Sequence, residues 1–173
     1  MKRIIVGLAF LSGIAVATPL AHATLITFTA TLDGSQQVPA NASTATGSGT
    51  VVLDDVADTM TVDLSWQGLT GPALAAHIHG PGAVGTNAAI LFPFANVPAV
   101  VSGSMPEQTI PITPAQIADL EAGLYYMNIH TLMFPLGEIR GQLTQVPEPG
   151  TLALVAGGAF GLAIVAKRRG THA

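Results

Sequence analysis

The middle of the chain carries the feature that most constrains its fold, a regular alternation of apolar and polar residues. In 26–32 and again in 60–66, every second residue is apolar, and the residues between them are Thr, Asp or Ser. A period of two places the apolar side chains on one face of a β-strand and the polar side chains on the other. These segments are therefore predicted to be half-buried strands that face a common core.

Similar segments bring the number of predicted strands to eight. They cover 25–32, 50–54, 59–67, 73–79, 88–94, 100–105, 124–131 and 138–145. The second and third strands are joined through 55–58, which predicts a hairpin, whereas 34–49 lacks periodicity and is predicted to be a long loop. Thr-Pro-Ala-Gln at 113–116 is typical of a capped helix N-terminus, and Gly123 is predicted to end that helix. The whole pattern predicts an all-β sandwich or barrel with one short helix.

The first 23 residues have the organisation of a secretory signal peptide. Two basic residues precede the apolar run 4–16, and Ala21 and Ala23 are the small residues that define a signal peptidase site. A retained membrane anchor is the alternative, but a run of about 13 residues is too short to span a hydrocarbon core of ~30 Å as a helix. We therefore expect signal peptidase to remove residues 1–23 during export.

The C-terminal segment 146–173 has the organisation of a membrane-inserted sorting segment. A proline-rich stretch at 146–150 precedes an uncharged run at 151–166, which is followed by three basic residues at 167–169. As a helix, the uncharged run rises roughly 24 Å, slightly less than a full span. The basic residues are expected to stay on the cytoplasmic side, so the body of the chain would face outward. A permanent C-terminal anchor is the alternative to a segment that is removed.

This segment, with the sequence VPEPGTLALVAGGAFGLAIVAKRRG, resembles the PEP-CTERM sorting signal of exported proteins in Gram-negative bacteria that make extracellular polysaccharide. The resemblance implies that an exosortase recognises Pro147, Glu148 and Pro149 and removes the helix after transient membrane insertion. The outer surface or the extracellular matrix is then the expected location. The predicted parts of the chain are a signal peptide (1–23), one β domain (24–145) and a sorting signal (146–173).

Composition excludes several classes of chemistry. The chain has no cysteine, so it can form no disulfide, iron–sulfur cluster, thiol nucleophile or cysteine-bound zinc site. Between the two ends, nine acidic side chains stand against one basic side chain, Arg140, whereas nucleic-acid binding requires several cations on one face. The body also shows no Ser/His/Asp triad, P-loop or dinucleotide-binding motif. We therefore expect neither a nucleic-acid partner nor an enzyme.

Five motifs follow one another along the body of the chain. They are LDGSQQVP at 32–39, LSWQGLTG at 64–71, AHIHGPG at 76–82, YMNIHT at 126–131 and FPLGEIRGQL at 134–143. Together they resemble the CHRD domain, a family named for its occurrence in chordin, over most of 29–143. The resemblance implies an immunoglobulin-like or Greek-key β-sandwich or barrel, and it implies little about function.

His77 and His79 are the strongest candidates for a binding site. Residues two apart on a strand point to the same face, with Cα atoms about 6.5–7 Å apart, while Ile78 enters the core. If the strand with His130 lies alongside at ~4.8 Å, a third imidazole completes a site suited to copper or zinc. The layout is similar to the copper ligands of Cu/Zn superoxide dismutase. The alternative is a structural cluster whose hydrogen bonds stiffen the loop 80–87.

Arg140 is expected on one face of its strand together with Glu138. Its ordinary role would be a paired structural arginine, with Glu138 or Asp63 among many possible partners. In the alternative role, Arg140 attracts an anion toward a metal held by the histidines. This second role depends on the histidine hypothesis.

Two functions are consistent with these patterns. The first is a non-enzymatic structural or binding component of the cell envelope or matrix, with a polysaccharide or a protein as its partner. The second is an exported copper- or zinc-binding protein, redox-active in one version, that uses His77, His79 and His130. Signal peptidase and exosortase are the partners expected during export in both cases.

Overall fold

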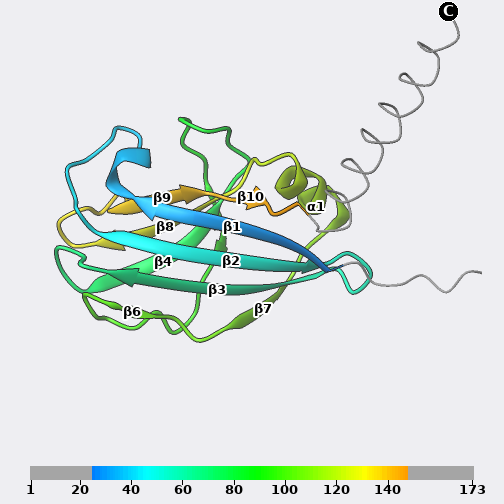
Figure 1. Ribbon diagram of the computed structural model, residues 1–173, viewed down its shortest axis with the longest axis horizontal. Coiled ribbons are helices and arrows are strands. Elements are labelled where there is room, and N and C mark those ends of the chain that lie inside the picture. The colour runs from blue at the N-terminus through cyan, green and yellow to red at the C-terminus, as the bar shows by residue number, and fades with distance from the viewer. Residues whose placement is uncertain (1–24, 148–173) are drawn as a thin grey trace, which may run out of the picture.

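The computed structural model describes residues 25–147, which form an antiparallel β fold with one short α-helix (Figure 1). The strands are β1 (Leu25–Asp33), β2 (Thr46–Asp54), β3 (Thr59–Gln67), β4 (Ala73–His79), β5 (Ile90–Pro93), β6 (Gly103–Ser104), β7 (Gln108–Pro111), β8 (Tyr126–Thr131), β9 (Ile139–Gln142) and β10 (Thr144–Gln145). The helices are the 3-10 helix η1 (Gly34–Gln36) and α1 (Pro114–Glu121). The predicted all-β fold class with one short helix is confirmed.

The strands form one antiparallel sheet that curls into two facing layers. Its order is β5-β4-β8-β9-β1-β2-β3-β6, with β7 also paired to β3 and β10 also paired to β1. In Figure 1, β1, β2 and β3 lie in front of β4 and β8, and α1 lies at one end of the sheet. β9 is joined to β1 through a single register pair, Asp33 with Arg140. The sheet passes from one layer to the other at this pair.

Apolar side chains from both layers fill the space between them. Phe28 of β1, Ile78 of β4 and Ile129 of β8 are fully buried. Trp66 of β3 is also buried, and its indole N–H donates to the carbonyl oxygen of Val100 at 3.2 Å. The period-two pattern predicted these inward positions correctly. β1 and β3 bury mainly one face, whereas β8 is buried on both faces.

β2 is longer than the sequence predicts. It begins at Thr46, so the predicted loop at 34–49 is wrong for residues 46–49. Gly47 and Gly49 have no side chains, so residues 46–49 show no alternation of apolar and polar residues from which a strand could be predicted. A Cβ on Gly49 would lie 2.1 Å from the Sδ of Met127 on the opposite layer, so any larger residue here would force the Met127 side chain to move.

The strands near the C-terminus of the domain also differ from the prediction. The strand predicted at 138–145 is two strands, because β10 leaves β8 and pairs with β1 instead. The strand predicted at 100–105 contracts to the two residues of β6, and β7 was not predicted. These are edge segments with few residues, in which alternation is too short to recognise.

α1 begins as the sequence predicts. The Oγ1 of Thr113 accepts a hydrogen bond from the N–H of Gln116 at 3.3 Å, and the Oε1 of Gln116 accepts one from the N–H of Thr113 at 2.9 Å. This capping box satisfies N–H groups that have no partner inside the helix. Gly123 follows the helix with a φ of +70°, a conformation that suits glycine. The buried Leu120 of α1 packs against the core.

The predictions for the two ends of the chain lie outside the described residues. This applies to the signal peptide with Ala21 and Ala23, to Glu148 and Pro149 of the sorting motif, and to the helix at 151–166. Within 25–147, no helix is long and apolar enough to cross a membrane.

Tyr125 carries a polar group that the core leaves unsatisfied. Its hydroxyl is buried and has no hydrogen-bond partner within residues 25–147. Burial, together with the Asp119 carboxylate, raises the pKa of this phenol to about 12. A buried polar group without a partner costs about 1–3 kcal/mol, so Tyr125→Phe is expected to raise the free energy of unfolding by about 1 kcal/mol. Urea denaturation of the purified full chain in mild detergent measures this change.

Tyr126→Phe is the matched control for that measurement. The phenol oxygen of Tyr126 accepts a hydrogen bond from the N–H of Ala88 at 3.0 Å, so this variant is expected to lose stability. Equal destabilisation by the two substitutions would contradict the assignment of the Tyr125 hydroxyl as unsatisfied.

Candidate metal centre

The pairing of β4 with β8 brings the three histidines onto one face of the sheet. His77 lies opposite Asn128, and Ala75 lies opposite His130, so His77 and His130 are diagonal neighbours on adjacent strands. Ile78, between the two histidines of β4, is fully buried on the other face. The structure thus meets both conditions of the histidine hypothesis: His77 and His79 share one face of β4, and His130 lies on the adjacent strand β8.

The three imidazole rings form a compact cluster. Ring centroids are 4.9 Å apart for His77 and His130, 5.6 Å for His77 and His79, and 6.0 Å for His79 and His130. One ring nitrogen from each residue lies within 4.8 Å of the other two. A tetrahedral ion with metal–nitrogen bonds of ~2.0–2.1 Å holds its ligand nitrogens about 3.4 Å apart. The upper limit of 4.8 Å exceeds that spacing by about 1.4 Å, so the side chains would have to move closer together to bind one ion.

Two backbone carbonyls fix the tautomers of His79 and His130. The Nδ1 of His79 lies 3.0 Å from the carbonyl oxygen of Ala88, and the Nδ1 of His130 lies 3.0 Å from the carbonyl oxygen of Pro135. Because a carbonyl oxygen only accepts, each Nδ1 must carry the proton and each Nε2 must carry a lone pair. Metal-binding histidines are oriented in this way by carbonyl or carboxylate partners on their second nitrogen.

The Nε2 of His79 is the least satisfied atom of the cluster. It is buried and has no hydrogen-bond partner within residues 25–147. By contrast, the Nε2 of His130 accepts a hydrogen bond from the Nδ1–H of His77, with 3.2 Å between the two nitrogens. A buried acceptor without a partner is costly. The fold therefore presents a nitrogen lone pair that no protein group uses.

Burial keeps all three imidazoles neutral at pH 7. The pKa of His77 falls to about 4, chiefly because of burial and secondarily because of the neighbouring His130 and His79. Burial also lowers the pKa of His79 and of His130, and it outweighs the opposing effect of their bonds to the Ala88 and Pro135 carbonyls. Neutral imidazole is the form that binds metal ions.

The lowered pKa of His77 predicts that the metal-free protein loses stability in mild acid. The unfolded chain takes up a proton on this imidazole near pH 6.5, whereas the folded chain takes it up only near pH 4. Between these values the unfolded state binds more protons, so the free energy of unfolding falls as the pH is lowered and the loss levels off below pH 4. Urea midpoints of the chelator-treated protein at about pH 7 and about pH 5 measure the effect. His77→Gln is expected to reduce the difference, and an unchanged difference would contradict the assignment.

An aromatic ring, that of Tyr126, and a cation, the guanidinium of Arg140, pack next to the histidine cluster. The ring of Tyr126 stacks on His79, with centroids 5.0 Å apart and an interplanar angle of 8°. The guanidinium of Arg140 lies over the same ring, with its Cζ 3.4 Å from the ring centroid. The imidazole of His79 is therefore held by its hydrogen bond to Ala88 and by the stacked phenol ring.

Arg140 forms neither of the two ion pairs named for it from the sequence. Within residues 25–147, neither Glu138 nor Asp63 pairs with its guanidinium, whose hydrogen bonds go to Asn87 and Gln142 at 3.4 Å. Sequence alternation placed Glu138 and Arg140 on one face, but Glu138 lies just before β9 and its carboxylate is bound elsewhere.

Hydroxyl groups, rather than a cation, hold the buried carboxylate of Glu138. Its Oε1 accepts from the Ser43 hydroxyl at 2.7 Å and from the Thr70 N–H at 2.8 Å. Its Oε2 accepts from the hydroxyls of Thr131 at 2.6 Å and Thr70 at 2.9 Å. Burial raises the pKa of Glu138, but these hydrogen bonds together lower it below its ordinary value. The carboxylate therefore joins the segment before β2, the β3–β4 loop and β8.

Comparison with known families agrees with this architecture. Residues 28–143 match the family model of the CHRD domain. The chain belongs to the CHRD-domain family. Residues 145–169 of this CHRD protein match the PEP-CTERM protein-sorting motif, so it is an exported surface protein processed by an exosortase. Neither family is known as an enzyme family. No curated protein and no solved structure matches the chain.

Sequence patterns missed several groups that shape the site of this CHRD protein. The carbonyls of Ala88 and Pro135 come from loops, and the stacking of Tyr126 on His79 depends on the β4–β8 register. Strand alternation places Tyr126 on the same face as His130 but does not indicate its contact with His79. Its position opposite His79 could be found once the two strands were aligned.

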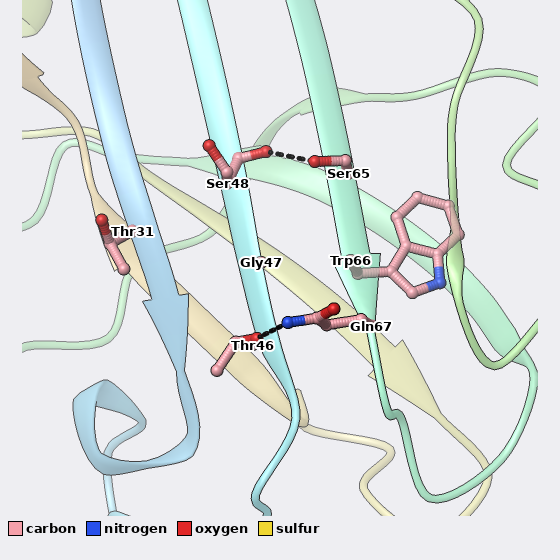
Figure 2. A pocket seen from close by; sticks show the side chains of 7 residues that line it. All are labelled: Thr31, Thr46, Gly47, Ser48, Ser65, Trp66 and Gln67. Carbon is pink, nitrogen blue, oxygen red and sulfur yellow. Dashed lines mark hydrogen bonds between the residues drawn. The ribbon is translucent and has the colours of Figure 1, made fainter.

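Apart from the histidine cluster, the CHRD domain has a pocket of about 530 Å³ on the outer face of β1, β2 and β3 (Figure 2). Its hydroxyl and amide side chains bond locally, Ser65 to the carbonyl of Ser48 at 3.4 Å and Gln67 to the hydroxyl of Thr46 at 3.1 Å. Figure 2 shows the indole of Trp66 extending away from Gln67. The lining includes no charged or metal-binding side chain, so the histidine cluster is the stronger candidate.

Proposed function

We propose that this exported CHRD-domain protein binds one copper or zinc ion through His77, His79 and His130. The observation that carries the proposal is the buried, unpartnered Nε2 of His79 within a cluster whose ligand nitrogens lie within 4.8 Å of one another. A purely structural cluster would be expected to satisfy this nitrogen, since buried polar groups are hydrogen-bonded in most folds.

The donor set favours copper and zinc over other ions. Three neutral imidazoles without a carboxylate suit these metals, whereas calcium and magnesium prefer oxygen ligands. Divalent copper binds nitrogen sites more tightly than zinc does, so copper is the expected occupant when both are present. Three protein ligands leave a further coordination position for water or another small ligand.

The proposed role is non-catalytic binding at the cell surface. His77 and His130 are half-buried, so an ion at the cluster would be reachable from solvent. The domain would then retain the metal ion outside the cell, where the sorting motif delivers the protein.

Metal analysis of the full chain, purified in mild detergent, tests the proposal. After exposure to an equimolar mixture of copper and zinc and removal of unbound metal, we expect one metal ion per chain, with copper in excess over zinc. A clearly sub-stoichiometric metal content would refute the proposal.

A second candidate function is adhesion to an envelope or matrix partner. Leu132, Met133 and Leu136 in the β8–β9 loop are 82%, 70% and 86% exposed, and Met133 and Leu136 line a groove of about 240 Å³. Exposed apolar side chains gathered in one loop are typical of contact surfaces. Replacing all three by Ser should release the protein from the cell surface, and unchanged retention would refute this role.

A further inference from the structure

Arg140 is buried without the partners that a guanidinium requires. It is the only basic side chain within residues 25–147, and it is 2% exposed. A guanidinium has five N–H donors. Its only hydrogen bonds in the described part of the chain are those to Asn87 and Gln142, both long at 3.4 Å. Contact with the Tyr126 ring supports the positive charge but accepts no hydrogen bond in the plane of the guanidinium.

The carboxylate best placed to neutralise Arg140 is bound to other groups. Asp33 is the register partner of Arg140 between β1 and β9. Its carboxylate instead accepts hydrogen bonds from the backbone N–H groups of Ser35 and Gln36 and from both of their side chains. These four bonds hold it in the η1 turn. Arg140 is therefore left as an unpaired cation in a domain that is otherwise acidic.

A cavity of about 240 Å³ adjoins the guanidinium. It lies below the ~300–1,000 Å³ of sites for drug-sized ligands, so it suits a small molecule. Amide and hydroxyl groups and two valines line the cavity beside Arg140, namely Ser35, Gln36, Gln37, Val38, Val84 and Gln142. The amide nitrogen of Gln37 donates to Asn128 at 2.8 Å, which leaves its Oε1 free to accept from a ligand hydroxyl.

We propose that this cavity binds a small hydroxyl-bearing monocarboxylate, with the carboxylate on Arg140 and a hydroxyl group on Gln37. A carboxylate matches the planar fork of a guanidinium and forms the strongest hydrogen bonds available to it. A single negative charge is favoured because the acidic domain repels a doubly charged anion more strongly. The valine side chains provide an apolar wall for the carbon skeleton of the ligand.

The proposed carboxylate site is distinct from the histidine cluster and does not rest on it. β8, which carries Tyr126, lies between β4 with His79 and β9 with Arg140. The Tyr126 ring centroid is 3.4 Å from the Cζ of Arg140 and 5.0 Å from the imidazole centroid of His79. Circular dichroism of each variant reports whether the domain keeps its fold, and this readout does not depend on metal binding.

Calorimetric titration of the full chain in mild detergent tests the proposal. The probes are sodium glucuronate, glucose as the ring without a carboxylate, and sodium sulfate as a dianion. We expect saturable binding of glucuronate at millimolar concentrations, much weaker binding of sulfate and none of glucose. Arg140→Gln is expected to weaken glucuronate binding at least tenfold, as loss of a charge-assisted bidentate contact predicts.

A second variant keeps the test informative if Arg140→Gln fails to fold. Val84 is 78% exposed at the rim of the cavity, so Val84→Glu leaves the core intact and places a negative charge beside the ligand. Val56→Glu is the matched control, because Val56 is 59% exposed in the β2–β3 turn, beyond the end of β2 that pairs with Leu25. We expect only Val84→Glu to weaken binding. Absence of saturable glucuronate binding, equal binding of glucose or sulfate, or equal effects of the two variants would overturn the proposal.

Discussion

His79→Phe is expected to abolish stoichiometric metal binding while the domain stays folded. Phenylalanine can stack on Tyr126 as the imidazole does, but it offers no nitrogen to a metal. Loss of a hydrogen bond to a ligand typically weakens metal binding 10–100-fold, so loss of the ligand itself should weaken it by about 100-fold or more. Competition with a chromophoric chelator, with the purified full chain loaded with copper or zinc, measures this change.

The histidines near the chain ends provide the control for this experiment. His22 and His172 are the two histidines outside residues 25–147, and a double replacement by Ala removes them without touching the cluster. We expect the double variant to bind metal as the unaltered chain does. If the double variant loses the metal and His79→Phe keeps it, the three-histidine site is refuted.

Glu138→Ala is expected to produce the largest loss of stability of the variants considered. The carboxylate is fully buried and accepts four hydrogen bonds. Its removal leaves one backbone N–H and three hydroxyl groups without their acceptor. Hydrogen bonds to charged groups contribute more than neutral ones, and breaking such a network costs on the order of 3–5 kcal/mol. Urea denaturation followed by circular dichroism measures the loss.

Two further variants test whether the loss of stability comes from the buried hydrogen bonds of Glu138 or from the removal of any glutamate. Glu121→Ala removes an exposed carboxylate at the end of α1 and should change the free energy of unfolding by less than about 0.5 kcal/mol. Glu138→Gln keeps one oxygen acceptor and should fall between the two. A Glu138→Ala protein as stable as Glu121→Ala would contradict the structural role of the buried carboxylate.

The fold could be predicted from sequence where one face of a strand is buried and the other is exposed. β1 and β3 show this pattern over 26–32 and 60–66, and their inward residues were identified correctly. The strand predicted for β2 is too short because Gly47 and Gly49 interrupt the pattern. A Cβ on Gly47 would lie 2.9 Å from the backbone oxygen of Ser65 on the neighbouring strand, and one on Gly49 would lie 2.1 Å from the Sδ of Met127. β7 and β10 are short edge strands, and their pairing depends on tertiary contacts rather than on local alternation.

The site was predictable to the extent that strand geometry determines it. The spacing of His77 and His79 gave their shared face, and the third histidine followed from one assumed strand pair. The partners of Arg140 and Glu138 could not be read in the same way. Their hydrogen-bonding groups come from loops far away in sequence, such as Ser43 and Thr70 for Glu138.

β10 determines how the domain meets its sorting motif. Gln145 pairs with Phe28, and the next residue, Val146, donates its N–H to the carbonyl of Thr27 at 2.8 Å. The chain is thus hydrogen-bonded to β1 as far as Val146, the residue before the Pro-Glu-Pro sequence. β10 has only two residues, and both are exposed. Breaking its pairing with β1 would therefore cost little free energy and would lengthen the extended segment that precedes the sorting motif, while the other strands stay paired.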